Sequence, residues 1–186
     1  MKRRKENREL EVLIEDCKRG NSKAQMEIYS QYFQAMYNIA LRIINHEAEA
    51  EDVMQESFLK AFQKIDSFRG EVTFGAWLKK IVINKSLDAI KNRKAMISLE
   101  TASDLPEDQA SETYLKYSDL SIEHVKEAIM KLPEGYRVVL SLYLIEGYDH
   151  DEISQILDIT NSTSRTQYHR ARKLLAKKIN ELKAVS

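Results

Sequence analysis

The spacing of apolar residues along the chain predicts a series of amphipathic helices. In the clearest stretch, apolar side chains recur about once per helical turn, at Ala24, Ile28, Phe33, Met36, Ala40 and Ile43. Ser22, with Gln25 three residues later, fits a capping box at the start of this stretch. Similar stripes run over residues 10–17, 48–62 and 73–90. No long stretch alternates as a strand would, and only five Gly and two Pro are present, so an all-α protein is predicted.

A second group of helices follows an acidic interruption. Residues 98–119 carry Pro, Ser, Thr and acidic side chains with weak apolar periodicity, which is typical of a linker. After it, Ser121 begins a new apolar stripe, Pro133 divides two helices, and Asp149 with Glu152 would cap a short third one. The pattern predicts two small helical domains and a flexible acidic linker between them: a bundle over 1–95, the linker over 96–120 and a second domain over 121–186.

The segment Asn161–Lys178, NSTSRTQYHRARKLLAKK, is polar at first and then strongly basic. A helix that begins at Ser162 or Thr163 would place one set of apolar residues on a single face: Tyr168, Ala171, Leu175, Ile179 and Leu182. The polar and basic residues would lie on the other side: Arg165, Thr166, His169, Arg170, Lys173 and Lys177. A short helix, a tight turn and a longer helix of this kind describe a helix-turn-helix, whose second helix meets base edges in the major groove. From these residues alone, a solvated basic surface helix is an equally good interpretation.

Charge is segregated along the chain, although the total is zero. Residues 159–186 contain seven Lys and Arg against one Glu, a net charge of +6. Residues 79–94 contain six basic residues against one Asp, a net charge of +5. Residues 99–123 contain seven acidic residues against one Lys, a net charge of −6. Two basic segments on either side of an acidic one favour local contact with nucleic acid.

The sequence contains little that would support catalysis. The single cysteine, Cys17, allows no disulfide within the chain and favours a reducing compartment. No apolar run is typical of a signal peptide or a membrane span, so a cytoplasmic protein is expected. The sequence has no Gly-rich phosphate loop, and its four histidines lack metal-ligand spacing. The acidic residues over 47–56 lie on different sides of a helix, so we expect no metal, no cofactor and no catalytic activity.

The order of several motifs resembles one family in particular. Residues 50–94 read AEDVMQESFLKAFQKIDSFRGEVTFGAWLKKIVINKSLDAIKNRK, and residues 132–160 read LPEGYRVVLSLYLIEGYDHDEISQILDIT before the basic helix. In this order they resemble bacterial sigma factors of the extracytoplasmic-function (ECF) group, small two-domain specificity subunits of RNA polymerase. The resemblance covers nearly the whole chain. It implies a subunit that binds core polymerase and directs promoter-specific initiation.

The resemblance implies roles for the first domain. Asp52, Gln55 and Glu56 match the face that docks on the clamp coiled coil of the largest polymerase subunit. Without the resemblance, the same residues describe a solvated acidic helix face. The loop 66–72 and the following helix match the reader of the promoter −10 element, with these residues as candidates: Phe68, Arg69, Trp77, Lys80, Asn84, Lys85, Lys91 and Arg93. Trp77 shares an apolar stripe with its neighbours, which favours a core position over direct base stacking.

The last helix matches the family's reader of the −35 element, and the resemblance assigns DNA contacts to Thr163, Arg165, Thr166, His169, Arg170 and Lys173. The commonest family pattern here is Gly-Thr-Val-Lys-Ser-Arg, whereas this chain has Ser-Thr-Ser-Arg-Thr-Gln over residues 162–167. Base contacts at Ser164 and Gln167 are therefore not carried over, and a different −35 preference is expected.

Further partners are implied by the same resemblance: the flap of the second-largest polymerase subunit, promoter DNA and an anti-sigma factor. A stand-alone helix-turn-helix regulator, with the first domain used for dimerisation or ligand sensing, is the alternative. A carboxylate-metal enzyme is a third hypothesis. Promoter-selective initiation with core polymerase distinguishes the first two, and metal analysis of the purified protein tests the third.

Overall fold

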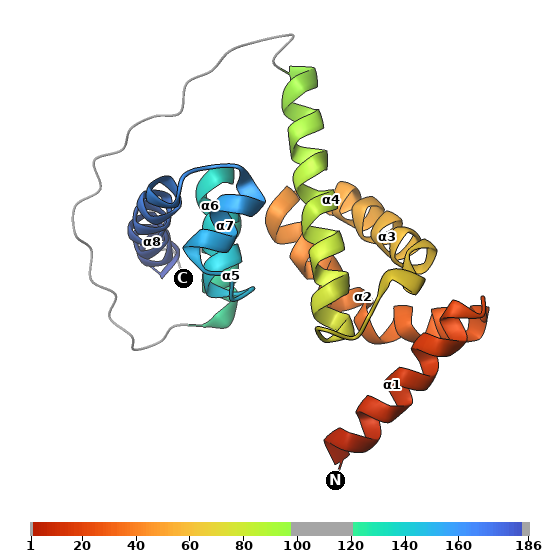
Figure 1. Ribbon diagram of the computed structural model, residues 1–186. Helices are drawn as coiled ribbons and strands as arrows, with labels where there is room; N and C mark the ends of the chain where they lie inside the picture. The colour runs from red at the N-terminus through yellow and green to blue at the C-terminus, as the bar shows by residue number, and fades with distance from the viewer. Residues whose placement is uncertain (1, 98–120, 184–186) are drawn as a thin grey trace. The chain divides into compact units, whose positions relative to one another are not determined.

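The protein divides into two compact helical units, residues 1–90 and 91–186, with the division inside the last helix of the first unit. The structure, a computed structural model, describes residues 2–97 and 121–183 (Figure 1). Every regular element in these two stretches is a helix, which confirms the all-α prediction. Apart from its first two residues, the linker expected at 96–120 lies outside the described part of the chain.

The first unit contains four α-helices and one short 3₁₀ turn. They are α1 (Lys2–Lys18), α2 (Ser22–Ile44), α3 (Glu47–Gln63), η1 (Ile65–Ser67) and α4 (Phe74–Ile97). Phe33 of the predicted stripe on α2 is an exception, because it is 39% exposed. Otherwise the predicted apolar stripes contribute to the core, and Ile28, Ile43 and Ile83 are almost completely buried. Each such side chain contributes about 1.5–3 kcal/mol to folding when it is removed from water.

The start of α2 differs from the prediction. The N-cap is Asn21, whose Oδ1 accepts hydrogen bonds from the backbone N–H groups of Lys23 at 2.9 Å and Ala24 at 3.4 Å. The capping box expected at Ser22 is therefore wrong by one residue, and Ser22 is the first residue of the helix. An N-cap needs a non-helical backbone, and the chain reverses at Gly20, where φ is +78°, so the extended residue is Asn21.

Within the described residues 121–183, the helices of the second unit are α5 (Ile122–Met130), α6 (Glu134–Leu144), α7 (His150–Leu157) and α8 (Asn161–Lys183). The predicted cap of α7 is confirmed: Asp149 Oδ1 accepts from Glu152 N at 2.8 Å, and Glu152 Oε2 accepts from Asp149 N at 2.9 Å. In this unit α8 packs against all three preceding helices. Helix α8 begins at Asn161, one residue before Ser162 and two before Thr163, the two predicted starts.

The core of the second unit joins α5, α6 and α8 through Ile129, Leu132, Leu140 and Ala171. Among the described residues of this unit, a charged side chain is buried. Arg137 on α6 is 3% exposed, and its Nη1 donates a hydrogen bond to the carbonyl oxygen of Leu132 at 2.9 Å. Burial lowers the pKa of Arg137. The guanidinium thus satisfies a backbone carbonyl where the chain passes from α5 to α6.

Candidate nucleic-acid interface

A tight turn joins α7 to α8 and begins the longer helix. Asp158 closes α7 in the left-handed region, with φ 55° and ψ 50°. Two residues later, Thr160 Oγ1 accepts the backbone N–H of Thr163 at 3.0 Å and lies 2.8 Å from the Thr163 hydroxyl. Thr160 therefore acts as the N-cap of α8. Short helix, turn and long helix form the predicted helix-turn-helix.

The outer face of α8 carries the polar residues that the sequence predicted. Arg165, Thr166, His169 and Arg170 are exposed over the first turns, whereas Thr163 and Lys173 are half-buried. The opposite face packs inward, with Ala171 and Ile179 buried and Tyr168 half-buried. A helix that buries one face against its unit and exposes basic and hydrogen-bonding groups at its N-terminal end has the form of a major-groove reader.

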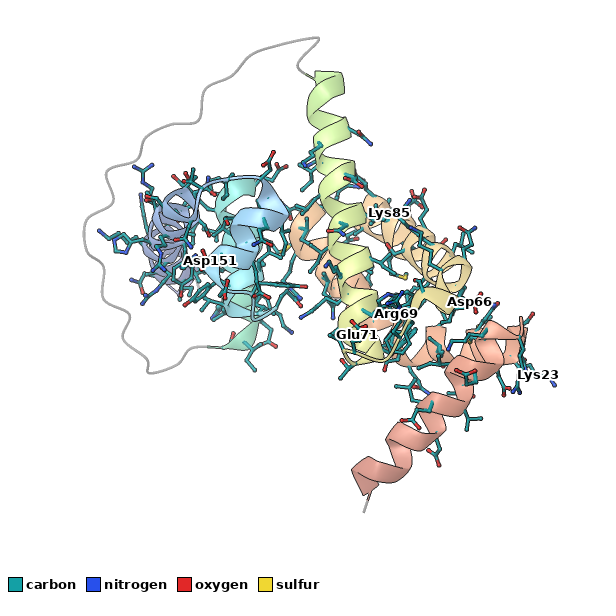
Figure 2. The ribbon with its side chains drawn as sticks, viewed as in Figure 1. Lys23, Asp66, Arg69, Glu71, Lys85 and Asp151 are labelled. Atoms are coloured by element: carbon teal, nitrogen blue, oxygen red, sulfur yellow. The ribbon has the colours of Figure 1, made fainter. Side chains whose placement is uncertain are left out.

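One exposed arginine of this face is held by two residues that the sequence did not single out. Arg165 Nε donates a hydrogen bond to Asn161 Oδ1 at 2.7 Å, and Asn161 Nδ2 donates to Asp151 Oδ1 at 2.6 Å. Asp151 lies on α7 (Figure 2). The i,i+4 spacing of Asn161 and Arg165 was a usable signal. The contact with Asp151 depends on how two helices pack, so no local pattern reveals it.

The position after the turn where the family pattern has Val is buried here. Ser164 is 0% exposed, and its Oγ lies 2.9 Å from Nδ1 of the buried His150 on α7. The imidazole stacks on Tyr143, with ring centroids 4.6 Å apart, and meets the edge of Tyr168. Burial, and to a smaller extent the charge of Arg165, lower the pKa of His150. Ser164 faces the interior of the unit, so its side chain is not available to read a base.

The predicted −10 residues of α4 do not share a single face. Helical spacing places Trp77, Lys80, Asn84 and Lys91 on one stripe; Lys80, Asn84 and Lys91 are exposed and Trp77 is half-buried. Asp88 lies on the same exposed stripe. Lys85 and Arg93 are half-buried on other sides of the helix. Of the predicted α4 residues, the exposed stripe therefore presents Lys80, Asn84 and Lys91, together with the carboxylate of Asp88.

Lys85 is tied to the neighbouring helix. Its Nζ lies 2.5 Å from Oε2 of Glu56 on α3, and Figure 2 labels Lys85 where α4 lies beside α3. The two residues were predicted for different roles, Glu56 for polymerase and Lys85 for DNA. Because they form an ion pair, a change at either one alters the charge presented at both positions.

The loop before α4 is anchored by an aromatic cluster. The half-buried ring of Phe68 makes an edge contact with Phe74, with centroids 5.5 Å apart, and packs on Trp77 at 5.4 Å. Arg69 is exposed, and Figure 2 shows it with Glu71 beside the beginning of α4. The predicted core position of Trp77 is thus partly realised, since its ring packs on two phenylalanines while part of it stays accessible.

The outer face of α3 contains the predicted docking residues and one apolar residue that was not predicted. Asp52, Gln55 and Glu56 are exposed, and Leu59 continues the same stripe with 63% of its surface exposed. We call this set, Asp52, Gln55, Glu56 and Leu59, the α3 stripe. A single exposed apolar side chain is common on protein surfaces, so Leu59 by itself does not mark a binding site.

Neither a membrane-spanning helix nor a cluster of metal-ligating side chains occurs among the described residues. No helix within 2–97 or 121–183 has a stretch apolar enough and long enough to cross a membrane. In the same residues, His, Cys, Asp and Glu side chains nowhere gather in a group of three or more that could hold a metal ion.

Comparison with known proteins places both units in one class. Residues 28–96 match Sigma-70 region 2, and residues 122–175 match Sigma-70, region 4. Over 184 residues the chain is 31% identical to the ECF RNA polymerase sigma factor SigW of Bacillus subtilis, covering 91% of this chain and 96% of SigW. It is also 31% identical over 183 residues to the ECF RNA polymerase sigma-E factor of Haemophilus influenzae. That match covers 92% of this chain and 96% of the relative. The protein belongs to the ECF group of the sigma-70 family.

Solved structures agree on the fold. The chain is similar to the sigma factor RpoE of Bartonella quintana, crystallised with the anti-sigma factor NepR. The TM-score is 0.57 and the sequence identity 21%, and the match covers 83% of this chain and 96% of RpoE. It is also similar to CnrH, solved in complex with the cytosolic domain of CnrY, with a TM-score of 0.52 and 23% identity. That match covers 94% of this chain and 97% of CnrH. At this level of identity the likeness shows the fold alone.

Proposed function

We propose that this sigma factor binds core RNA polymerase through its first unit and reads promoter DNA with both units. In this proposal α8 reads the −35 element as duplex, while the loop 66–72 and α4 read the −10 element as the strands separate. The observation that carries the proposal is the outer face of α8. There Arg165, Thr166, His169 and Arg170 are exposed together on the second helix of a helix-turn-helix.

In the −35 complex, the N-terminal residues of α8 are proposed to enter the major groove. Arg165 and His169 would contact base edges, and Thr163 and Lys173, nearer the sides of the helix, would contact phosphates. A guanidinium that forms two parallel hydrogen bonds to a guanine supplies about 1–3 kcal/mol of discrimination against other bases. Lysine contacts to phosphate would add affinity that does not depend on sequence and that weakens as salt is raised.

In the −10 complex, the first unit is proposed to stabilise separated strands. Unstacking a base costs a few kcal/mol, which a basic surface and a contact for the extruded base can offset. The exposed stripe of α4 supports this role through Lys80, Asn84 and Lys91, and Arg69 of the loop adds a positive charge at one end. Phe68 is proposed to position the loop through its aromatic contacts rather than to stack on a base.

Polymerase docking is assigned to the α3 stripe. Asp52, Gln55 and Glu56 would orient the clamp coiled coil, and Leu59, at the C-terminal end of the stripe, would supply an apolar contact. The acidic segment 99–123, with its net charge of −6, would lie along the polymerase. An anti-sigma factor that covers these surfaces in the cytoplasm would be the regulatory partner. The protein performs no bond-making chemistry in this scheme.

Transcription with purified core polymerase tests the proposal. The full chain should direct initiation from a defined set of promoters, and scrambling either the −35 or the −10 element should reduce it. Arg165→Ala should reduce initiation from promoters with an intact −35 element and have little effect once that element is scrambled. Tight DNA binding by the protein alone, with no added initiation by core polymerase, would instead favour the stand-alone regulator.

A further inference from the structure

Three side chains form a continuous hydrogen-bonded row on the helix-turn-helix. The row runs from Asp151 on α7 through Asn161 at the start of α8 to Arg165 one turn later, with donor–acceptor distances of 2.6 Å and 2.7 Å. Only one orientation of the Asn161 amide satisfies both bonds, because its oxygen must face the guanidinium and its nitrogen must face the carboxylate. Asp151 therefore fixes the amide, and the amide presents an acceptor to Arg165.

The bond to Arg165 uses one particular nitrogen. Asn161 accepts from Nε, and no hydrogen bond joins the two terminal nitrogens of Arg165 to another residue within the described chain. The guanidinium is planar, so fixing Nε sets the direction in which the two terminal groups point. Those two groups form the fork that recognises a guanine edge through two parallel hydrogen bonds.

We propose that Asn161 and Asp151 are positioning residues that orient the guanidinium of Arg165 for base readout. This inference rests on the proposed −35 function and adds to it the source of base selectivity. An arginine with a free side chain loses rotamer freedom when it forms directed bonds. Orienting the fork before DNA arrives reduces that loss and favours the base that matches the set direction.

A different role for the same row is to clamp α7 to α8. That role predicts a lower unfolding temperature when the row is broken, with no change in which base is preferred. Positioning predicts a change in preference at one base pair that depends on the presence of Arg165. The two roles are therefore separated by measuring selectivity and thermal unfolding on the same variants.

The experiment uses the full chain with core polymerase on a promoter library in which the −35 element is randomised and the −10 element is constant. Sequencing of transcripts gives the preference at each position. Arg165→Ala should lower the preference at one base pair by about fivefold or more, the lower end expected for a two-bond contact. Asn161→Ala should lower preference at the same base pair by about threefold or more, and less than Arg165→Ala.

Two combinations of variants test the mechanism. In the Arg165→Ala background, Asn161→Ala should cause no further loss of preference, because it acts only through the arginine. Asn161→Asp should lower preference, since two carboxylates then face each other. Asn161→Asp combined with Asp151→Asn should recover it, because the exchanged pair restores both hydrogen bonds at the same net charge. Gln155→Ala, an exposed polar change on α7, is the control and should leave preference unchanged.

The outcomes are distinct. Unchanged preference in Asn161→Ala, or an equal additional loss in the Arg165→Ala background, overturns the positioning role. Failure of the exchanged pair to recover preference also overturns it. A wild-type protein that shows no preference at any −35 position overturns the proposed function and this inference with it. A lower unfolding temperature with unchanged preference assigns the row to clamping.

Discussion

His150 Nδ1 lies 2.9 Å from Ser164 Oγ, and both side chains are buried between the two helices of the helix-turn-helix. The pair accounts for one departure of this chain from the usual family pattern. Where that pattern has an apolar Val, this chain has a hydroxyl and supplies it with a buried hydrogen-bonding partner. The departure at position 164 therefore concerns packing, and the altered −35 preference expected from the sequence has to come from exposed positions.

Removing the hydroxyl should destabilise the second unit. Ser164→Ala leaves the buried His150 nitrogen without its partner, which should lower the free energy of unfolding by about 1–3 kcal/mol. Replacing both partners by apolar groups, with His150→Phe and Ser164→Val together, should recover much of that loss. Denaturant unfolding followed by circular dichroism measures both. If Ser164→Ala unfolds like the wild-type protein, the hydrogen bond contributes nothing to stability.

Mild acid should destabilise the same unit. Burial lowers the pKa of His150 below its ordinary value of 6.5, and the nearby charge of Arg165 acts in the same direction, while Asp149 and Asp151 oppose it. The unfolded chain therefore binds more protons than the folded one in this range. The stability is fully present above pH 6.5 and is lost as the pH falls through 6.5 toward the folded pKa.

The control for the pH effect is the protein that carries both His150→Phe and Ser164→Val. Its free energy of unfolding should depend less on pH between neutrality and pH 5 than that of the wild-type protein. The rings that pack on His150 are those of Tyr143 and Tyr168. Equal pH dependence in the two proteins would assign the effect to other groups.

Changes on the α3 stripe should weaken polymerase binding and leave the fold intact. Leu59→Ser removes the proposed apolar contact and should lower affinity for core polymerase about tenfold or more. Asp52→Lys should lower it as well, and is preferable to a change at Glu56, which would also release Lys85. Glu27→Lys, an exposed charge reversal on α2, is the matched control. Equal affinities for all four proteins, measured by fluorescence anisotropy, would refute the docking assignment.

Truncation of Phe68 separates a packing role from a DNA-binding one. Phe68→Ala removes ring contacts to Phe74 and Trp77 and should lower the free energy of unfolding by about 1–2 kcal/mol. Trp77 is the only tryptophan in the sequence, so its fluorescence reports this change directly. Phe68→Leu should recover part of the stability. A variant of unchanged stability and emission that no longer opens promoters would place Phe68 in contact with DNA instead.

Most of the helices could be predicted because the signals are local. A helix that buries one face repeats its apolar residues about every 3.6 positions, and Asp149 with Glu152 caps α7 within a single turn. The start of α2 was misplaced by one residue because Asn21 and Ser22 are both good N-cap residues. The choice between them depends on where the preceding turn leaves an extended backbone, which composition does not specify.

The candidate site was predicted less completely. The exposed face of α8 followed from its spacing, since Arg165, His169 and Arg170 lie opposite an apolar stripe. Ser164 lies one turn before Tyr168 and so continues the buried stripe, but its polarity concealed its position. Leu59 was not singled out, because the apolar periodicity within the run FLKAF does not mark which of its residues stays exposed.

The sequence by itself determined the helices, the segregation of charge and, through the order of its motifs, the sigma-70 family. The helices and the charge segregation depend on residues close together in the sequence, and the family assignment depends on the order of the motifs. Both can be read from the sequence without knowledge of the packing. Only the tertiary structure decided the partners that lie far apart: Glu56 with Lys85, His150 with Ser164, and Asp151 with Asn161. Such pairs form where two helices pack, and the rotation of each helix about its axis is determined by the whole core.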